Sequence, residues 1–315
     1  MIAVIGGTGF VGAALTTRLI AGPEPVRALV RDEGRARARL GGVADHVELV
    51  VGDMHDDAAL DALLAGARAV YLLAQTVTTR QPSGSGDFAA AERDGVVRLI
   101  AAAHRAGVGR VLTVGLIGAR ADAPNSWVRS RAEIEQLLLG SGLQATVLRP
   151  GLVAGAGSVG FDGVLSAAGR RSALIRGHGR QHWSYIALSD LVDYLVDALD
   201  APGTFGQVLD VGSTEAPTYR ELILRTALLL GHRPPVIHGI PLALLRIPAP
   251  LLERRGRMAR GGLRAAINHL GDDLIGDPVP IAALLPRTLL SWDDAVRAAL
   301  GSETAARPGS SPSTA

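Results

Sequence analysis

Three glycines near the start of the chain have the spacing of a phosphate-binding turn. Gly6, Gly9 and Gly12 are three residues apart, between the apolar run 2–5 and apolar residues that continue at helical spacing through 13–20. In such a strand–turn–helix context, the first glycine allows a tight turn and the second lets backbone approach a pyrophosphate. The third lets the helix lie close to the strand. An ordinary tight turn is the alternative, but the context favours a dinucleotide at the helix N-terminus.

The end of the expected second strand, 26–30, carries the residues that would select the cofactor. Arg31 follows this strand directly, and Asp32 comes next. An acid at this place bonds the ribose 2′-hydroxyl of NAD, whereas an arginine accommodates the 2′-phosphate of NADP. We interpret Asp32 as the N-cap of the following helix. The sequence therefore favours NADP(H) over NAD(H).

Another acid, Asp53, follows the expected third strand, 47–51. Ligands of open α/β sheets bind outside the carboxyl ends of the strands, so Asp53 could accept a hydrogen bond from an adenine amino group. It could equally cap the helix that begins near Asp57. The sequence leaves both interpretations open.

Two side chains of the second half, His182 and Tyr185, could carry a proton. Histidine is the natural acid–base group near neutral pH. A histidine in a pocket wall or on the surface is the more common case, and we prefer that interpretation for His182. The histidines and acids show no metal-ligand spacing, and no Gly-x-Ser-x-Gly elbow predicts a hydrolase.

Alternating strands and helices would position these residues. Short β-branched runs predict strands at 2–5, 26–30, 47–51, 69–74, 110–114, 145–148 and 208–211. Helical periodicity predicts helices at 13–20, 89–106, 128–139, 188–199, 219–230 and 291–300. The alternation predicts an α/β protein with a Rossmann-type doubly wound parallel sheet and a smaller, interleaved, helix-rich C-terminal lobe.

The second half is less regular, and its division is an expectation. We expect an NAD(P)-binding Rossmann domain at 1–155 and a substrate lobe at 156–301, with 186–211 returning to the main sheet. We expect a mobile loop at 75–86 and the lining of the nicotinamide end at 151–163. We expect helices around a pocket at 241–270 and a disordered tail at 302–315.

The composition excludes several classes of protein. The 315 residues are 48% hydrophobic, carry a formal net charge of +2 and include neither cysteine nor lysine. Disulfides, thiol nucleophiles and cysteine metal sites are therefore excluded. The basic residues form no stripe, so nucleic acid is not implied, and no apolar run reaches membrane-spanning length. Because a strand is expected at the very first residues, we expect no signal peptide and a cytoplasmic location. As a partner we expect a small-molecule substrate. The oligomeric state stays open.

Several motifs together resemble the atypical and extended short-chain dehydrogenase/reductase (SDR) superfamily, and the NmrA-like proteins within it. The resemblance is carried by the glycine turn 6–12, by Val26–Arg31, by Gly52-Asp53 and by Leu148–Gly151. It implies a nicotinamide cofactor, and it places His182 and Tyr185 at the border of the substrate pocket. The cofactor-binding residues that it implies are Gly6, Gly7, Thr8, Gly9, Phe10, Val11, Gly12, Arg31, Asp53, Met54, Ala74, Gln75, Arg131, Pro150, Leu152 and Val153.

The chain departs from that superfamily where the proton chemistry is expected. The resemblance predicts a Ser or Thr after the fifth strand and a Tyr-x-x-x-Lys motif on the next helix. Here the first place holds Gly115 and Leu116, and the second reads Trp127-x-x-x-Arg131. An indole nitrogen only donates, and arginine does not give up its proton, although it can bond ribose hydroxyls.

Three functions are compatible with a cofactor-binding turn in a chain that lacks the Ser/Thr, Tyr and Lys residues of the superfamily. The first, which we favour, is an NADPH-dependent reductase whose proton comes from solvent, from the substrate or from His182 or Tyr185. Hydride transfer is the cofactor's own chemistry, so the protein need only position the substrate. The second is an isomerase, lyase or cyclase without net redox. The third is a non-catalytic NADP(H) sensor or assembly protein.

Overall fold

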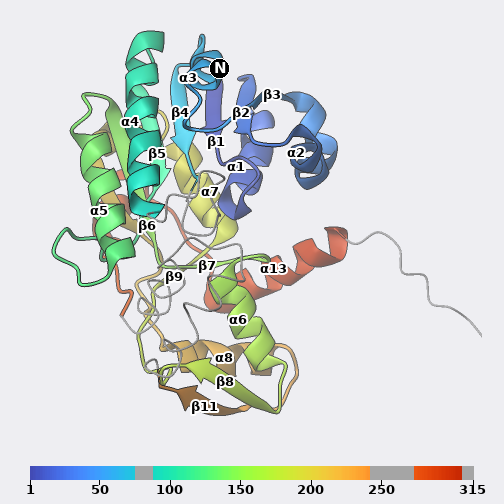
Figure 1. The fold of residues 1–315 in the computed structure, drawn as a ribbon. Coiled ribbons are helices and arrows are strands. Elements are labelled where there is room, and N and C mark those ends of the chain that lie inside the picture. The colour runs from blue at the N-terminus through green and yellow to red at the C-terminus, as the bar shows by residue number, and fades with distance from the viewer. Residues whose placement is uncertain (75–87, 242–272, 307–315) are drawn as a thin grey trace, which may run out of the picture.

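A parallel sheet of seven strands forms the larger part of the molecule (Figure 1). The computed structural model describes residues 1–74, 88–241 and 273–306. The strand order is β10-β6-β5-β4-β1-β2-β3, and every neighbouring pair is parallel. The strands are β1 (Ile2–Ile5), β2 (Val26–Val30), β3 (Val47–Val51), β4 (Ala69–Leu72), β5 (Arg110–Val114), β6 (Gln144–Pro150) and β10 (Gln207–Val211). The predicted doubly wound Rossmann-type fold is confirmed.

Helices cover both faces of this sheet because its central strands are apolar on both sides. Ile2 and Val4 of β1 face a core formed with α1 (Phe10–Ile20), α2 (Glu33–Leu40), α7 (Leu188–Asp197) and α12 (Val279–Leu284). Ala3 and Ile5 face the opposite core, formed with α3 (Asp57–Leu64), α4 (Phe88–Ala106) and α5 (Ser126–Leu139). Short 3₁₀ turns at Gly41–His46 and Pro202–Thr204 precede β3 and β10.

A smaller lobe lies beyond the carboxyl ends of the strands (Figure 1). It holds α6 (Val159–Ala168), α8 (Tyr219–Leu229), α13 (Trp292–Ala306) and the parallel pair β8 (Ser172–Arg176) and β11 (Val236–Ile240). A second parallel pair, β7 (Leu152–Ala154) and β9 (Tyr185–Ala187), connects the lobe to the main layer. The lobe has a core of its own, which includes Phe161, Trp183 and Trp292. The segment 186–211 supplies α7 and β10 to the main layer.

The structure differs from the sequence predictions mainly after residue 150. The glycine-rich segment 151–163, expected only as a lining, forms β7 and the start of α6. The last helix continues to Ala306, so the expectation of a disordered tail from residue 302 is wrong for residues 302–306. The expected loop at 75–86 and nearly all of the expected helices at 241–270 lie outside the described residues. Within the described ranges, no helix is long and apolar enough to cross a membrane.

Candidate cofactor site

The glycine turn joins β1 to α1 at the carboxyl edge of the sheet. Gly6 has a φ of +86°, a conformation that other residues rarely adopt. A Cβ on Gly6 would lie 2.6 Å from the backbone nitrogen of Ala74, which follows β4. A Cβ on Gly12 would lie 2.0 Å from the carbonyl oxygen of Gly6. The turn therefore packs on backbone at both ends, as the roles predicted for these two glycines require.

The middle of the turn is open. A Cβ on Gly9 would meet only the carbonyl oxygen of Gly6 within 4 Å, at 3.2 Å. Gly9 is exposed and is the N-cap of α1, where no side chain caps the helix. The first N–H groups of α1 therefore have no capping side chain, and free N–H groups at a helix N-terminus can bind an anion.

The other residues of the turn hold it in place. Gly7 lies in the interior, and its carbonyl oxygen accepts a weak hydrogen bond from Thr16 Oγ1 at 3.4 Å. Val11 packs on the core beneath α1, and Thr8 is half-buried. The ring of Phe10 lies against the loop after β7, because a Cβ on Gly155 would be 3.0 Å from its Cζ. Phe10 therefore links the turn to the smaller lobe.

At the end of β2, the two charged residues have different surroundings. Asp32 is the N-cap of α2, and its side chain accepts a hydrogen bond from the backbone N–H of Arg35 at 2.8 Å, as interpreted from the sequence. Arg31 is exposed, and it has no hydrogen bond or ion pair within the described parts of the chain. A cation is therefore available at this edge, whereas the neighbouring carboxylate is engaged.

At the end of β3, Asp53 does not cap α3. The N-cap is Asp56, whose side chain accepts a hydrogen bond from the N–H of Ala59, so the capping alternative for Asp53 is wrong. Asp53 instead accepts a hydrogen bond from the N–H of His55 at 2.7 Å and is half-exposed. Met54 packs beneath α4, where a Cβ on Gly95 would lie 3.0 Å from its Cβ.

The remaining predicted cofactor residues lie on neighbouring strand ends. Ala74 packs beside Gly6, while Gln75 lies outside the described residues. Pro150 ends β6, and Leu152 and Val153 form β7. The structure thus gathers the predicted residues of β1, β2, β3, β4 and β6 along one edge of the sheet.

Arg131 lies in the interior, paired with an acid of α4. Its side chain is 5% exposed and forms an ion pair with Glu92 of α4, which is also 5% exposed. Glu92 was not predicted, because nothing in the local sequence of α4 distinguishes it. The Nε of Arg131 has no hydrogen-bond partner among the described residues, and the ribose contact expected of Arg131 stays a prediction.

A second buried ion pair stands one turn further along α5. Glu135 is 3% exposed and accepts hydrogen bonds from Arg149 of β6, from Nε at 3.0 Å and from Nη2. Arg149 also donates to the carbonyl oxygen of Ala119, at 3.2 Å. Sequence reasoning missed this pair, although the spacing of Arg131 and Glu135 already places both on one face of a helix.

The two predicted proton carriers are both engaged. The hydroxyl of Tyr185 donates to Glu215 at 2.9 Å and accepts from the backbone N–H of Trp292 at 3.0 Å. Burial raises the pKa of Tyr185, and the hydrogen bond to Glu215 adds to this rise. His182 is exposed, and its Nδ1 donates to the carbonyl oxygen of Ala216 at 2.8 Å. The position of His182 agrees with the preferred interpretation of a surface histidine.

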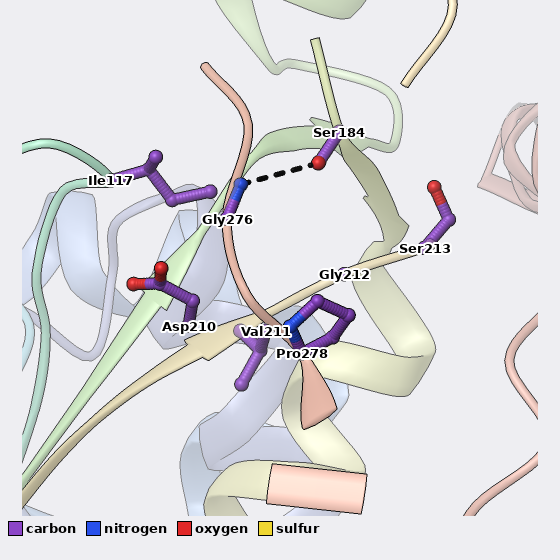
Figure 2. Close-up of a pocket in the computed structure, with 8 residues that line it drawn as sticks. All are labelled: Ile117, Ser184, Asp210, Val211, Gly212, Ser213, Gly276 and Pro278. Atoms are coloured by element: carbon purple, nitrogen blue, oxygen red, sulfur yellow. Dashed lines mark hydrogen bonds between the residues drawn. The ribbon is translucent and has the colours of Figure 1, made fainter. Parts of the chain in front are cut away.

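A narrow recess lies at the end of β10 (Figure 2). The hydroxyl of Ser184 accepts from the N–H of Gly276 at 3.4 Å, and Asp210 accepts from the N–H of Asp277 at 3.1 Å. These bonds hold the segment 276–278 across the strand end. The recess encloses almost no free volume, so it is not a pocket for an organic ligand. Its lining is Ile117, Ser184, Asp210, Val211, Gly212, Ser213, Gly276 and Pro278.

Comparison with known proteins gives concordant matches. The family described as NAD(P)H-binding matches residues 6–202. A (4-alkanoyl-5-oxo-2,5-dihydrofuran-3-yl)methyl phosphate reductase of Streptomyces griseus is 31% identical over 291 residues, which are 88% of this chain and 94% of the relative. An NAD(P)H azoreductase of Xenophilus azovorans is 28% identical over 219 residues, 69% of each chain. An NADPH-dependent quinone oxidoreductase of Escherichia coli, solved with NADPH, shares the fold with a TM-score of 0.69 at 20% identity, covering 95% of this chain and 100% of that one.

Proposed function

Because the chain belongs to the NAD(P)H-binding family, we propose that it is an NADPH-dependent reductase of a small organic molecule. The observation that carries the proposal is the glycine turn. Gly6 and Gly12 pack on backbone while Gly9 leaves the N-terminus of α1 open, which is the arrangement that a pyrophosphate needs.

The preference for NADPH is proposed from the end of β2. Arg31 supplies an exposed cation there, and the carboxylate of Asp32 is engaged by the N–H of Arg35. A guanidinium matches the geometry of a phosphate and forms charge-assisted hydrogen bonds with it. Asp53 keeps one carboxylate oxygen for an adenine amino group, since its hydrogen bond to His55 uses the other.

Reduction, rather than a non-redox use of the cofactor, is supported by the names of the relatives. The two relatives compared above are both named as reductases. The reduced cofactor supplies a hydride when it is bound. The residues of this chain would hold it along the strand ends, with Pro150, Leu152 and Val153 toward the smaller lobe. Because the hydroxyl of Tyr185 is engaged within the fold, we propose that the proton comes from solvent.

Titration calorimetry with NADPH tests whether the protein binds this cofactor through the glycine turn. The wild type should bind NADPH, and Gly9→Val should lose at least tenfold in affinity because its side chain would fill the phosphate space. Gly42→Val is the matched control, since a Cβ at Gly42 meets nothing within 4 Å. Unchanged binding by Gly9→Val would show that the turn does not hold the phosphates. Absence of NADPH binding by the wild type would overturn the proposed function.

A further inference from the structure

The ring of His55 lies between Asp53, just after β3, and the first turns of α4. Its Nε2 is 3.1 Å from the carbonyl oxygen of Ala91, and because a carbonyl oxygen only accepts, Nε2 is the donor. Its Nδ1 is 3.6 Å from Oδ1 of Asp53, and its Nε2 is 3.8 Å from Oδ2 of Asp94. The imidazole therefore connects the loop after β3 with α4.

Close packing sets the distance between α4 and this loop. A Cβ on Gly95 would lie 3.0 Å from Cβ of Met54 and 3.8 Å from Cε1 of His55. Glycine lowers the stability of a helix interior, and here the missing side chain lets the helix backbone approach the loop. The approach brings the carbonyl oxygen of Ala91 within reach of the imidazole. His55 thus has a partner on α4, although its side chain is 38% exposed.

The two oxygens of the Asp53 carboxylate have different surroundings. Oδ1 accepts a hydrogen bond from the backbone N–H of His55 at 2.7 Å and faces Nδ1 of the same residue. Within the described parts of the chain, Oδ2 has no hydrogen bond, and the side chain of Asp53 is 47% exposed. A carboxylate that is held by one oxygen presents the other in a defined direction. This direction depends on the position of residue 55, and hence on its contact with α4.

We propose that His55 is a positioning residue for the adenine base. By anchoring the loop to α4, it keeps the free oxygen of Asp53 directed at the 6-amino group, so that the protein distinguishes adenine from a purine without this group. The proposal rests on the proposed function, in which Asp53 faces the adenine of NADPH. Hypoxanthine carries a carbonyl oxygen in place of the amino group, and two acceptors form no hydrogen bond. A site built around an N–H donor rejects an analogue that lacks it.

Titration calorimetry with NADPH and with its analogue, reduced nicotinamide hypoxanthine dinucleotide phosphate, tests this role. The wild type should bind NADPH at least about tenfold more tightly, as expected for a hydrogen bond to a charged group. His55→Leu should lower this ratio of Kd values to about 1–2, because it weakens the binding of NADPH alone. His55→Gln should keep the ratio, because its amide N–H can donate to the carbonyl oxygen of Ala91. A purely structural role would weaken the binding of both dinucleotides equally and leave the ratio unchanged.

His104→Leu is the matched control. His104 is also an exposed histidine whose Nε2 contacts a carbonyl oxygen, that of Ser141 at 2.8 Å, but it lies in the last turn of α4. This variant should keep the wild-type ratio. A ratio for His55→Leu within threefold of the wild-type value would overturn the proposal, and so would a wild type that binds both dinucleotides equally. Absence of NADPH binding by the wild type would instead count against the proposed function.

A double-mutant cycle tests whether His55 acts through Asp53. Asp53→Ala should raise the Kd for NADPH about tenfold. Adding His55→Leu to this variant should change the Kd no further, because the carboxylate that His55 positions is gone. An additional rise of threefold or more would show that His55 affects cofactor binding by another route and would overturn the proposal.

Discussion

Gly12 lies directly against the carbonyl oxygen of Gly6, so closely that a methyl group at position 12 would be 2.0 Å from that oxygen. The neighbour is backbone, and Gly6 is itself held against Ala74. A side chain at position 12 can therefore be accommodated only if α1 moves away from the turn. The position of the first helix against the glycine turn thus requires a glycine at position 12.

Gly12→Ala should destabilise the protein and weaken NADPH binding together. Overpacking of this kind costs about 1–3 kcal/mol, which urea unfolding would detect. The control is Gly42→Ala, whose new methyl group meets open space. A Gly12→Ala variant as stable as Gly42→Ala would show that the turn has room for a methyl group.

Arg31→Ala should erase most of the preference for NADPH over NADH. An arginine–phosphate bond contributes about 1.5–3 kcal/mol, so the Kd for NADPH should rise by roughly one to two decades while that for NADH stays unchanged. Arg39→Ala, an exposed arginine in the last turn of α2, serves as the control. Equal affinity of the wild type for both cofactors would refute the role given to Arg31.

Arg131→Met should be strongly destabilising because it leaves Glu92 buried without its partner. Breaking a buried pair costs about 3–5 kcal/mol, whereas replacing both members by apolar residues is often close to neutral. The double variant Arg131→Met/Glu92→Leu should therefore recover most of the lost stability in urea unfolding. A double variant no more stable than the single one would show that the two charges do not act as a pair.

Lowering the pH should remove the contribution that Glu24 makes to the free energy of unfolding. The hydrogen bond from Arg68 lowers the pKa of Glu24 from 4.5 to about 2, and the amino group of Met1 adds to this effect. A lowered folded-state pKa stabilises the protein above the unfolded value, and the gain is lost as pH falls from about 4.5 to about 2. The stability difference between wild type and Glu24→Gln, roughly 1–3 kcal/mol at pH 7, should shrink by pH 3. Asp45→Asn, at an exposed pair with Arg37, should show little difference at either pH. A difference that is the same at pH 7 and pH 3 would exclude this linkage.

The main sheet could be predicted because its strands are short, mainly apolar runs that contain β-branched residues. The expected strands at 26–30, 47–51 and 110–114 agree with β2, β3 and β5 at both ends. The short strands β7 and β9 could not be found this way. Each has only three residues, and each pairs with a partner about thirty residues away, so local pattern carries little information about them.

In the candidate site, too, features set by local sequence could be predicted, and features set by distant residues could not. The conformation of Gly6 and the capping role of Asp32 follow from local backbone chemistry, which sequence reasoning can reach. The burial of Arg131 follows from Glu92, which belongs to another helix and has no local signal. The chemistry of Tyr185 makes it a candidate proton carrier, but its hydrogen bonds are set by Glu215 and by the start of α13. Long-range partners decide which polar side chains remain available.

The return of β10 to the main sheet has a consequence for how the chain can be made and divided. Gln207 of β10 pairs with Thr146 of β6, so this edge of the sheet is completed only after the intervening part of the smaller lobe has been synthesised. Until then, the outer side of β6 offers unpaired backbone groups to any neighbouring strand. A fragment ending at residue 155 would keep the whole glycine turn, but the outer side of β6 would remain unpaired. The fragment would also lack α7, which packs against α1. The N-terminal part of the protein is therefore not an independent unit that could be excised or grafted. Its edge strand, β10, comes from a part of the chain that follows most of the smaller lobe.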